Sequence, residues 1–483
     1  MEELIAAGVE RVELSEEILS KAVQTLQAEG RVVVEDEAVY LRGLYQAEQG
    51  IADSLKALMS QPMDRRRFEP DKATAWAQDR FQIQFSEAQV ESVKMAVSEK
   101  VSVITGGPGT GKTTILRAVL AILEALNSKV VLAAPTGRAA KRLSEATSRE
   151  AKTLHRLLDF RPGEGKFRHD RDNPLKADAV IVDETSMVDT VLAYRLLEAV
   201  PRHASLLLVG DVDQLPSVGP GNVLRDILNS GAIPSIKLDE IFRQGERSQI
   251  VEQAHRINQG IMPRWPRNLN EHSDFYVVFY VVTTDDPDRA AEIIVELCAT
   301  RIPRRFGFDP MNDIQVLCPM NRGSVGSTAL NGRLQEALNP SGPAVTRFGR
   351  TYREGDRVLQ TVNDYDKNVF NGDLGRVSRL DLDAGNLAVA YDEGEVDYDF
   401  NELDELLPAY AISVHRSQGS EYPCVVIPVM TQQYLMLQRN LIYTAVTRAG
   451  KLAVLVGSPK AIAIAVKNQK AVEGHTALAS RLC

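Results

Sequence analysis

The stretch GGPGTGKTT, residues 106–114, follows the apolar run VSVIT and precedes the helix-forming run ILRAVLAILEAL. It fits the pattern G-x-x-x-x-G-K-[ST] of a loop between a strand and a helix. The glycines let backbone N–H groups close around phosphates, and the N-terminus of the following helix adds positive potential. The sequence therefore predicts an α/β nucleotide-binding domain built on a parallel sheet.

Two side chains of this loop have specific expected tasks. Lys112 is expected to reach the β- and γ-phosphate oxygens of ATP, and Thr113 is expected to ligate Mg²⁺. ATP and Mg²⁺ are therefore the predicted cofactors. The other loop residues predicted to bind the nucleotide are Gly107, Pro108, Gly109, Thr110, Gly111 and Thr114.

An acidic pair ends an apolar strand in AVIVDETSM, residues 179–187. Asp183 is expected to hold Mg²⁺ through water, and Glu184 to orient and deprotonate the attacking water. Gln214 follows the end of the next apolar strand, and its amide can donate to the γ-phosphate while accepting from that water. Adjacent carboxylates with a polar sensor indicate ATP hydrolysis rather than phosphate transfer to a small molecule.

The pattern of strands and helices indicates several units. Apolar strands alternate with helical stretches over most of the chain, which is typical of parallel α/β architecture. Residues 344–407 interrupt this rhythm with short strands and Asn-Gly or Gly-Asn turns, and predict a small inserted β-barrel. Residues 14–28 have helical spacing and lead into two short β-rich pieces, which indicates a winged-helix-like N-terminal unit.

The charge distribution leaves nucleic acid open as a partner. The 483 residues carry a formal net charge of −9, and most of this excess lies in residues 1–60. That acidic segment is unsuited to tight DNA contact and is a candidate docking surface for a protein partner. The remaining chain is nearly neutral, and phosphate contacts need only local basic groups and N–H donors.

The four scattered cysteines form neither a metal motif nor a disulfide scaffold, which fits a reducing cytosol. The N-terminus is acidic where a signal peptide would be basic, and no segment has the roughly 20 apolar residues of a membrane helix. We therefore expect a soluble, cytoplasmic protein without membrane contact.

Ten short motifs stand in order along about residues 80 to 460, and together they resemble the RecD-like branch of superfamily-one DNA helicases. This resemblance implies two RecA-like P-loop domains with ATP between them. It further implies a stand-alone, monomeric motor that moves 5′ to 3′ on single-stranded DNA and unwinds single-strand/double-strand junctions in repair or recombination. The motifs are SEAQ, GGPGTGKTT, APTGRAAKRL, TLHRLL, VDETSM, LVGDVDQLPSVGPG, LDEIFRQ, CPMNRG, YAISVHRSQGSEY and LIYTAVTRA.

The resemblance implies three domains. A small N-terminal helical, winged-helix-like domain would span residues 1–78, a first RecA-like domain 79–240 and a second 241–483. The first would include a β-hairpin pin at about 159–175 that splits the duplex, with a surface loop as the alternative. The second would include an SH3-like barrel at about 344–407 that closes over the DNA, with structural padding as the alternative.

The resemblance also implies further nucleotide contacts. Gln89 would contact the adenine, Glu421 would lie near the ribose, and Arg243 and Arg448 would reach the γ-phosphate from the second domain. Arg448 interrupts an apolar run, and a buried fixed charge needs an anionic partner or a route to water. For Arg243, the alternative is a surface ion pair.

The implied DNA contacts fall at strand ends and the starts of the following helices. Backbone N–H groups and basic side chains there can bind phosphates without reading bases. The alternatives are structural histidines, a capped turn at Asn321, and a solvated basic helix face at Lys141 and Arg142. The predicted residues are Pro135, Thr136, Gly137, Arg138, Thr153, His155, Asn321, Arg322, Ser413, His415 and Gln418.

Two other functions stay open on this reasoning. The chain could translocate on RNA or RNA–DNA hybrids, because stacking and phosphate contacts do not reveal the sugar. It could instead be an ATP-switched assembly module in a repair complex, with the acidic first 60 residues as its docking surface.

Overall fold

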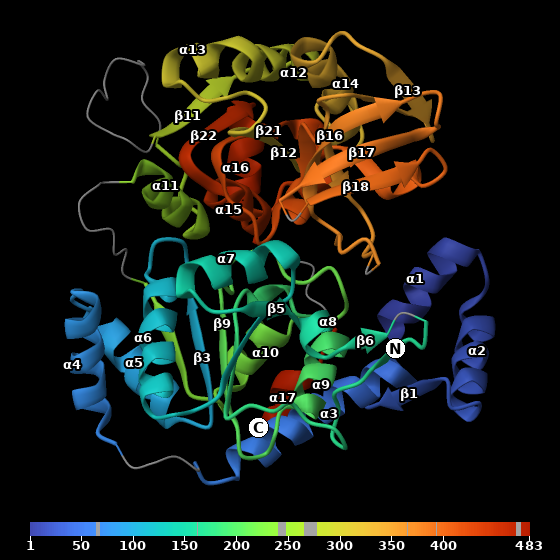
Figure 1. Cartoon of the computed structure of the whole chain (residues 1–483). Coiled ribbons are helices and arrows are strands. Elements are labelled where there is room, and N and C mark those ends of the chain that lie inside the picture. Colours follow the sequence, from blue (N-terminus) through green and yellow to red (C-terminus); the bar gives the residue numbers. More distant parts are fainter. Residues whose placement is uncertain are drawn as a thin grey trace.

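Two parallel sheets, each covered by helices on both faces, form the two halves of the protein (Figure 1). The first sheet lies in the lower half of Figure 1 and the second in the upper half, with a small barrel beside the second. The computed structural model describes residues 1–63, 68–161, 163–239, 248–264, 278–364, 366–392, 394–469 and 475–483.

The first sheet has six parallel strands in the order β10-β3-β9-β8-β4-β5. Successive side chains of a strand point to opposite faces, so Val180 and Val182 join one hydrophobic cluster and Ile181 joins the other. Burial on both faces explains why these strands are continuously apolar. The strands are β3 (Val101–Gly106), β4 (Val130–Ala134), β5 (Ala151–Thr153), β8 (Ala179–Val182), β9 (Ser205–Gly210) and β10 (Ser235–Leu238).

Helices from distant parts of the chain cover this sheet. One face is covered by α5 (Glu87–Ser98), α6 (Lys112–Ala125) and α7 (Gly137–Thr147), with α4 (Pro70–Phe81) against α6. The other is covered by α3 (Arg42–Met59), α9 (Thr190–Ala199), α10 (Val223–Ser230) and α17 (Leu478–Leu482). Among the described residues, no helix has both the length and the apolar character needed to cross a lipid bilayer.

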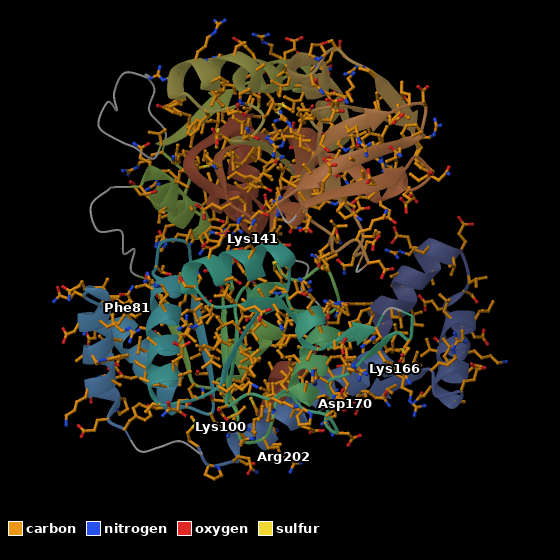
Figure 2. The ribbon with its side chains drawn as sticks, viewed as in Figure 1. Phe81, Lys100, Lys141, Lys166, Asp170 and Arg202 are labelled. Atoms are coloured by element: carbon orange, nitrogen blue, oxygen red, sulfur yellow. The ribbon has the colours of Figure 1, made fainter. Side chains whose placement is uncertain are left out.

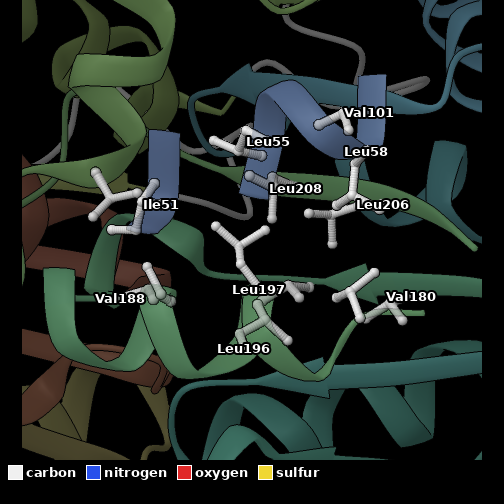
Figure 3. Close-up of a cluster of buried hydrophobic side chains, with 14 of the residues drawn as sticks. Ile51, Leu55, Leu58, Val101, Val180, Val188, Leu196, Leu197, Leu206 and Leu208 are labelled. Carbon is white, nitrogen blue, oxygen red and sulfur yellow. The ribbon is translucent and has the colours of Figure 1, made fainter. Parts of the chain in front are cut away.

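The N-terminal unit has the expected helix followed by a hairpin. It consists of α1 (Glu2–Val12), α2 (Glu16–Ala28) and the antiparallel pair β1 (Val32–Glu35) and β2 (Ala38–Leu41). The boundary expected at residue 78 differs from the packing, because α3 already belongs to the first core. Ile51, Leu55 and Leu58 of α3 lie in one buried cluster with Leu196 and Leu197 of α9 (Figure 3).

The second sheet has five parallel strands in the order β11-β22-β21-β12-β20. They are β11 (Val278–Thr283), β12 (Ile314–Cys318), β20 (Ala411–Ser413), β21 (Tyr422–Val429) and β22 (Ala449–Gly457). One face packs against α11 (Gln249–Asn258), α15 (Arg439–Thr447) and α16 (Pro459–Lys467). The other packs against α12 (Pro287–Glu296), α13 (Ile302–Phe306) and α14 (Ser327–Leu338).

The insertion expected at 344–407 is present as a five-stranded antiparallel sheet with an added hairpin. The hairpin of β13 (Ala344–Arg347) and β14 (Arg350–Arg353) places Val345 and Tyr352 in the core of this sheet. The strand order is β18-β17-β16-β15-β19. The strands are β15 (Arg357–Gln360), β16 (Leu374–Asp381), β17 (Asn386–Tyr391), β18 (Gly394–Asp399) and β19 (Leu406–Pro408).

Two buried charged residues fix the barrel to the second domain. Asp356 accepts hydrogen bonds from Tyr410 Oη at 2.7 Å and from Gln335 Nε2 at 2.5 Å. Arg357 donates to the carbonyl oxygen of Ile314 at 2.7 Å and to Gln315 Oε1 at 2.6 Å. Because buried polar groups are costly to leave unpaired, these bonds make the barrel and the second sheet one mechanical unit.

The region expected to form a pin contains a short hairpin. Its strands are β6 (Phe160–Arg161) and β7 (Lys166–Phe167), preceded by the one-turn helix α8 (Leu154–Leu157). The rings of Phe160 and Phe167 lie 4.8 Å apart, and the ring of His155 lies 5.6 Å from Phe160 and 5.7 Å from Phe167. The hairpin is therefore attached to α8 by an aromatic cluster.

The C-terminal segment packs in the first domain, although the sequence-based boundaries assign it to the second (241–483). Leu478 and Leu482 of α17 join the first-domain cluster, and the C-terminus lies beside α3 in Figure 1. Arg481 pairs with Glu48 of α3 at 2.9 Å and with Glu35 of β1. The sequence-based boundary is wrong here because the apolar and charged partners of α17 lie hundreds of residues upstream, and local periodicity carries no signal for such distant pairings.

We predict that Arg481→Ala destabilises the first domain. Removing the arginine leaves Glu48, only 6% exposed in its side chain, as a buried charge without its cation. Breaking such a pair typically costs about 3 kcal/mol or more. Urea unfolding monitored by circular dichroism would measure the loss. Arg289→Ala, which removes an exposed pair with Glu292, is the control and should cost less than about 1 kcal/mol. Equal midpoints for the two variants would contradict the prediction.

Candidate functional site

The glycine-rich loop between β3 and α6 has the backbone that its sequence demands. Gly109 and Gly111 have φ of 76° and 88°, in the left-handed region that favours glycine. A Cβ on Gly111 would lie 2.3 Å from Gln89 Nε2. Lys112 Nζ donates to the carbonyl oxygens of Gly106 at 2.5 Å and Gly107 at 2.9 Å, so the ammonium group lies within the loop.

Gln89 links this loop to the start of α5 by hydrogen bonds. Its Oε1 accepts from the backbone N–H of Ser86 at 3.1 Å, and its Nε2 donates to the carbonyl oxygen of Thr110 at 3.0 Å. The side chain is buried and is not among the residues that line the cavity described below. Its expected contact with adenine stays a prediction, whereas its contact with the loop is direct.

The acidic pair at the end of β8 is held in a strained arrangement. Glu184 has φ of 52°, unusual for a residue with a side chain, and its N–H donates to Asp183 Oδ1 at 2.8 Å. Burial and the neighbouring Glu184 carboxylate raise the pKa of Asp183 to about 6. Two crowded carboxylate groups suit a hard divalent cation, which takes oxygen ligands, so the residues present fit Mg²⁺.

One cavity of about 450 Å³ collects the predicted catalytic residues of both domains. The first domain contributes the loop, the acidic pair and Gln214, and the second contributes residues from the start of β21 and the end of α15. The sequence-predicted residues that line it are Gly107, Pro108, Gly109, Gly111, Lys112, Thr113, Thr114, Asp183, Glu184, Gln214, Glu421 and Arg448. Arg243 lies outside the described residues.

Arg448 is a buried cation bonded to neutral oxygen atoms. It is 4% exposed, and it donates to the carbonyl oxygen of Ser420 at 3.2 Å and to Thr447 Oγ1 at 3.5 Å. Within the described part of the chain, its Nε has no hydrogen-bond partner. Because an uncompensated buried charge is costly, the guanidinium group is poised for an anion in the cavity that it lines.

Sequence reasoning missed two residues that connect Gln214 to the second domain. Asp211 Oδ2 accepts from Gln214 Nε2 at 3.2 Å and from Tyr443 Oη of α15 at 2.9 Å. Burial raises the pKa of both Asp211 and Tyr443, and the Asp211 charge adds to the effect on Tyr443. The available signal was Asp211 itself, a charged residue at the end of the apolar strand β9.

The next residue extends this connection. The N–H of Leu215 donates to Thr444 Oγ1 at 2.9 Å, and its carbonyl oxygen accepts from Gln418 Nε2 at 2.9 Å. Both partners belong to the second domain. The segment that carries the candidate sensor is therefore hydrogen-bonded to the opposite domain through both backbone groups of one residue, Leu215.

A second cavity, of about 640 Å³, gathers many of the predicted DNA-binding residues. We call it the groove. Thr136 and Arg138 of the first domain and Asn321, Ser413, His415 and Gln418 of the second line it. Asn371, Gly372 and Asp373 of the barrel line it as well. Its apolar lining residues include Met187, Val218, Met320 and Met436.

The other predicted DNA-binding residues, Pro135, Gly137, Thr153, His155 and Arg322, do not line this groove. Thr153 Oγ1 accepts from the N–H of Arg156 at 3.2 Å and caps α8. Burial lowers the pKa of His155, whose ring packs on the hairpin. Arg322 is exposed. DNA contacts by these residues stay predictions.

The basic face of α7 contacts protein rather than only solvent. Arg138 Nη1 donates to Ser420 Oγ at 2.8 Å and to Tyr422 Oη at 3.0 Å. Arg142 pairs with Glu421 at 2.5 Å, and Lys141 pairs with Asp392 of the barrel at 2.5 Å. Figure 2 shows Lys141 at the boundary between the two halves. These charges link the domains across the interface that contains both cavities.

Two RecA-like sheets that line one P-loop cavity, with an inserted barrel beside a second cavity, have the architecture of a two-domain P-loop nucleotide-binding protein. Three family models match the chain. Residues 89–220 match an AAA domain, residues 330–391 match the ATP-dependent RecD-like DNA helicase SH3 domain, and residues 408–456 match the UvrD-like helicase C-terminal domain.

Curated relatives cover most of the chain. The RecBCD enzyme subunit RecD of Mycolicibacterium smegmatis is 33% identical over 90% of this chain and 80% of its own. The ATP-dependent RecD2 DNA helicase of Deinococcus radiodurans is 37% identical over 92% of this chain and 58% of its own length. The chain belongs to the RecD-like family of ATP-dependent DNA helicases, and it spans little more than half the length of the Deinococcus relative.

A solved structure of Pif1 helicase from Bacteroides in complex with ADP-AlF3 and single-stranded DNA aligns with 77% of this chain and 92% of its own. The TM-score is 0.45 and the sequence identity is 19%.

We predict that Gly111→Ala weakens nucleotide binding. The new Cβ would meet Gln89 Nε2, and the left-handed backbone would be strained. Strain of this kind costs on the order of 1–3 kcal/mol, so ATP affinity should fall roughly tenfold or more. Titration with a fluorescent ATP analogue would measure it. Gly231→Ala is the matched control, because Gly231 has φ of +62° but no atoms near the added Cβ. Equal affinities of the two variants would contradict the prediction.

Proposed function

We propose that this chain is a DNA helicase that hydrolyses ATP in the 450 Å³ cavity and moves 5′ to 3′ along single-stranded DNA in the groove, as a single chain. One observation carries the proposal. The same cavity is lined by Lys112 and Asp183 of the first domain and by Arg448 of the second, so nucleotide binding and domain closure are coupled. The names of the relatives, RecD and RecD2 DNA helicase, support DNA as the partner.

The first-domain residues have distinct proposed roles. Lys112 and the loop N–H groups bind the phosphates, and Thr113 and Asp183 would hold Mg²⁺, which when bound neutralises charge on the β- and γ-phosphates. Glu184 accepts a proton from the attacking water, and Gln214 orients that water. The role of Gln214 is supported by its bond to Asp211, which restricts the direction of its amide.

Arg448 is proposed to stabilise the charge that develops on the γ-phosphate. In this role the Arg448 guanidinium group pairs with the γ-phosphate, which provides the anion that its buried position requires. The attraction between these two groups would draw the second domain toward the first. Hydrolysis and phosphate release remove this attraction, so the domains separate again. The Asp211–Tyr443 and Leu215–Thr444 bonds would transmit the change to the groove through the loop that carries Val218.

The groove fits a single strand held without base readout. Thr136, Asn321 and Ser413 offer hydroxyl and amide groups for phosphates and sugars. Met187 and Met320 offer soft apolar surface to bases of any sequence. The hairpin β6–β7 is the proposed pin that parts the duplex, supported by its rigid aromatic attachment to α8.

The proposal is tested with duplexes that carry a 5′ tail or a 3′ tail. We expect ATP-dependent unwinding of the 5′-tailed substrate and little of the 3′-tailed one, and none with Lys112→Ala. Matched single strands of DNA and RNA, added in an ATPase assay, test the choice of nucleic acid. Unwinding only from 3′ tails would contradict the polarity, and stimulation by RNA alone would contradict the substrate.

We predict that Arg448→Ala nearly eliminates ATP turnover but leaves nucleotide binding intact. Losing a transition-state arginine in such sites costs roughly 10³-fold in turnover, whereas the phosphate loop binds the ground state without it. Steady-state ATPase and analogue binding measure the two effects. Arg289→Ala, an exposed arginine on α12, is the control. Normal turnover in Arg448→Ala would refute the assignment.

We predict that shortening the hairpin, by replacing residues 161–166 with two glycines, abolishes unwinding and spares DNA-stimulated ATPase. The described residues of this segment do not line either cavity, so translocation should continue without strand separation. Strand-displacement and ATPase assays on the same preparation provide the comparison. Unwinding at the normal rate would show that the hairpin does not part the strands.

A further inference from the structure

The barrel touches the first domain at two places: one is the Lys141–Asp392 ion pair, and the other is a contact made by its tip. We define the barrel tip as residues 366–373, which lie between β15 and β16. Arg156 of α8 donates from Nη2 to Asn368 Oδ1 of the tip at 2.7 Å. The same guanidinium group lies 5.0 Å from the centre of the Phe370 ring. We call the contact of Arg156 with Asn368 and Phe370 the latch.

The tip is shaped to make this contact. Asp364 Oδ1 accepts from the N–H groups of Asp366 and Lys367, both at 2.9 Å, and forms a tight turn. Asn368 follows with φ of 56°, a left-handed conformation that asparagine tolerates. Lys367 Nζ donates to Glu402 at 2.7 Å, which ties the turn to the end of the barrel. The side chains of Asn368 and Phe370 are therefore positioned by a loop that is itself fixed by hydrogen bonds.

The latch is one of several contacts that join the three bodies lining the groove. The first domain joins the barrel at the tip through Arg156, in addition to the Lys141–Asp392 pair. The barrel is fixed to the second domain through Asp356 and Arg357. The second domain returns to the first through the bonds of Leu215 to Thr444 and Gln418. All three bodies line the groove, for example at Thr136, Gly372 and Ser413. A strand in the groove would therefore have the first domain, the second domain and the barrel as neighbours.

We propose that Arg156 determines which strands reach the groove: a strand with a free end can thread in, whereas a strand without ends must pass through the open latch. This inference rests on the proposed function, in which the groove holds single-stranded DNA. Arg156 is thus a specificity-determining residue that touches neither nucleotide nor reacting atoms.

The chemistry of the latch suits a contact that opens and recloses. Arg156 and Asn368 are exposed, so water replaces their hydrogen bond when they separate. Phe370 is only 8% exposed, and the return of Arg156 covers its apolar ring again. A planar guanidinium group can donate in its plane and stack with its face at once, which a lysine ammonium group cannot do.

The test closes the latch covalently in the full chain. Arg156→Cys and Asn368→Cys are introduced with Cys483→Ser, because Cys483 is exposed while Cys298, Cys318 and Cys424 are buried. A bis-maleimide with a cleavable bridge, spanning about the length of an arginine side chain, joins the pair. The single variant Arg156→Cys, treated in the same way, controls for modification alone. The probes are a fluorescent oligo(dT) in linear form and the same oligonucleotide closed into a circle.

We expect the affinity of the bridged protein for the circle to fall by about tenfold or more, because the binding-competent open state is removed. Its affinity for the linear strand should stay unchanged. Cleaving the bridge should restore the affinity for the circular oligonucleotide. Equal binding of circle and linear strand by the bridged protein would overturn the proposal. Failure of the unbridged protein to bind the linear strand would instead overturn the proposed function, so the two failures are distinct.

A second measurement needs no cross-link. Arg156→Ala should associate with the circle about threefold faster, because binding no longer waits for a conformational change, with little effect on the linear strand. Arg156→Lys should resemble Arg156→Ala. Arg202→Ala, at the lower edge of the first domain in Figure 2, is the matched control and should not differ from the unmodified chain. An unchanged association rate for Arg156→Ala would count against the latch.

Discussion

The candidate nucleotide cavity contains a buried cation, Arg448, that forms no ion pair with any of the described residues. Arg448 lies in the second domain with its guanidinium bonded to neutral oxygen atoms, and it lines the same cavity as Lys112, Asp183 and Glu184 of the first. Such a charge is costly unless an anion reaches it. A phosphate held by the loop would satisfy the requirement, and only when the two sheets face each other. The candidate nucleotide site is therefore complete only when both domains contribute their residues.

The two domains are held together mainly by contacts at their interface rather than by one common core. One pair of hydrophobic clusters covers the first sheet and another pair covers the second, and Leu215 of the first domain packs into a cluster of the second. Other contacts that join the domains are polar, such as Arg142 with Glu421 and Arg138 with Ser420. Partly exposed ion pairs are worth less than about 1 kcal/mol each, so opening the interface costs little compared with unfolding either core.

One short segment connects the chemistry to the groove. Asp211 holds Gln214 and accepts from Tyr443, Leu215 is bonded to the second domain on both sides, and Val218 lines the groove. The segment begins where the buried strand β9 ends, and the continuous hydrogen bonding of the parallel sheet fixes its origin. A change at the cavity therefore has a hydrogen-bonded route to the groove, and the bonds of Asp356 and Arg357 would transmit a movement of the second domain to the barrel.

The sequence by itself determined the local units and their chemistry. The loop at 106–114, the acidic pair after β8 and the insertion at 344–407 follow from glycine spacing, strand periodicity and turn residues, all of which act within a few residues. The tertiary structure decided which units meet. Gln89 supports the loop, Arg138 and Arg142 pair with the second domain, and α17 returns to the first core. It also joined Arg156 to the barrel tip, 212 residues away. Such pairings depend on the packing of whole sheets, which local periodicity cannot encode, and so they became visible only in the folded chain.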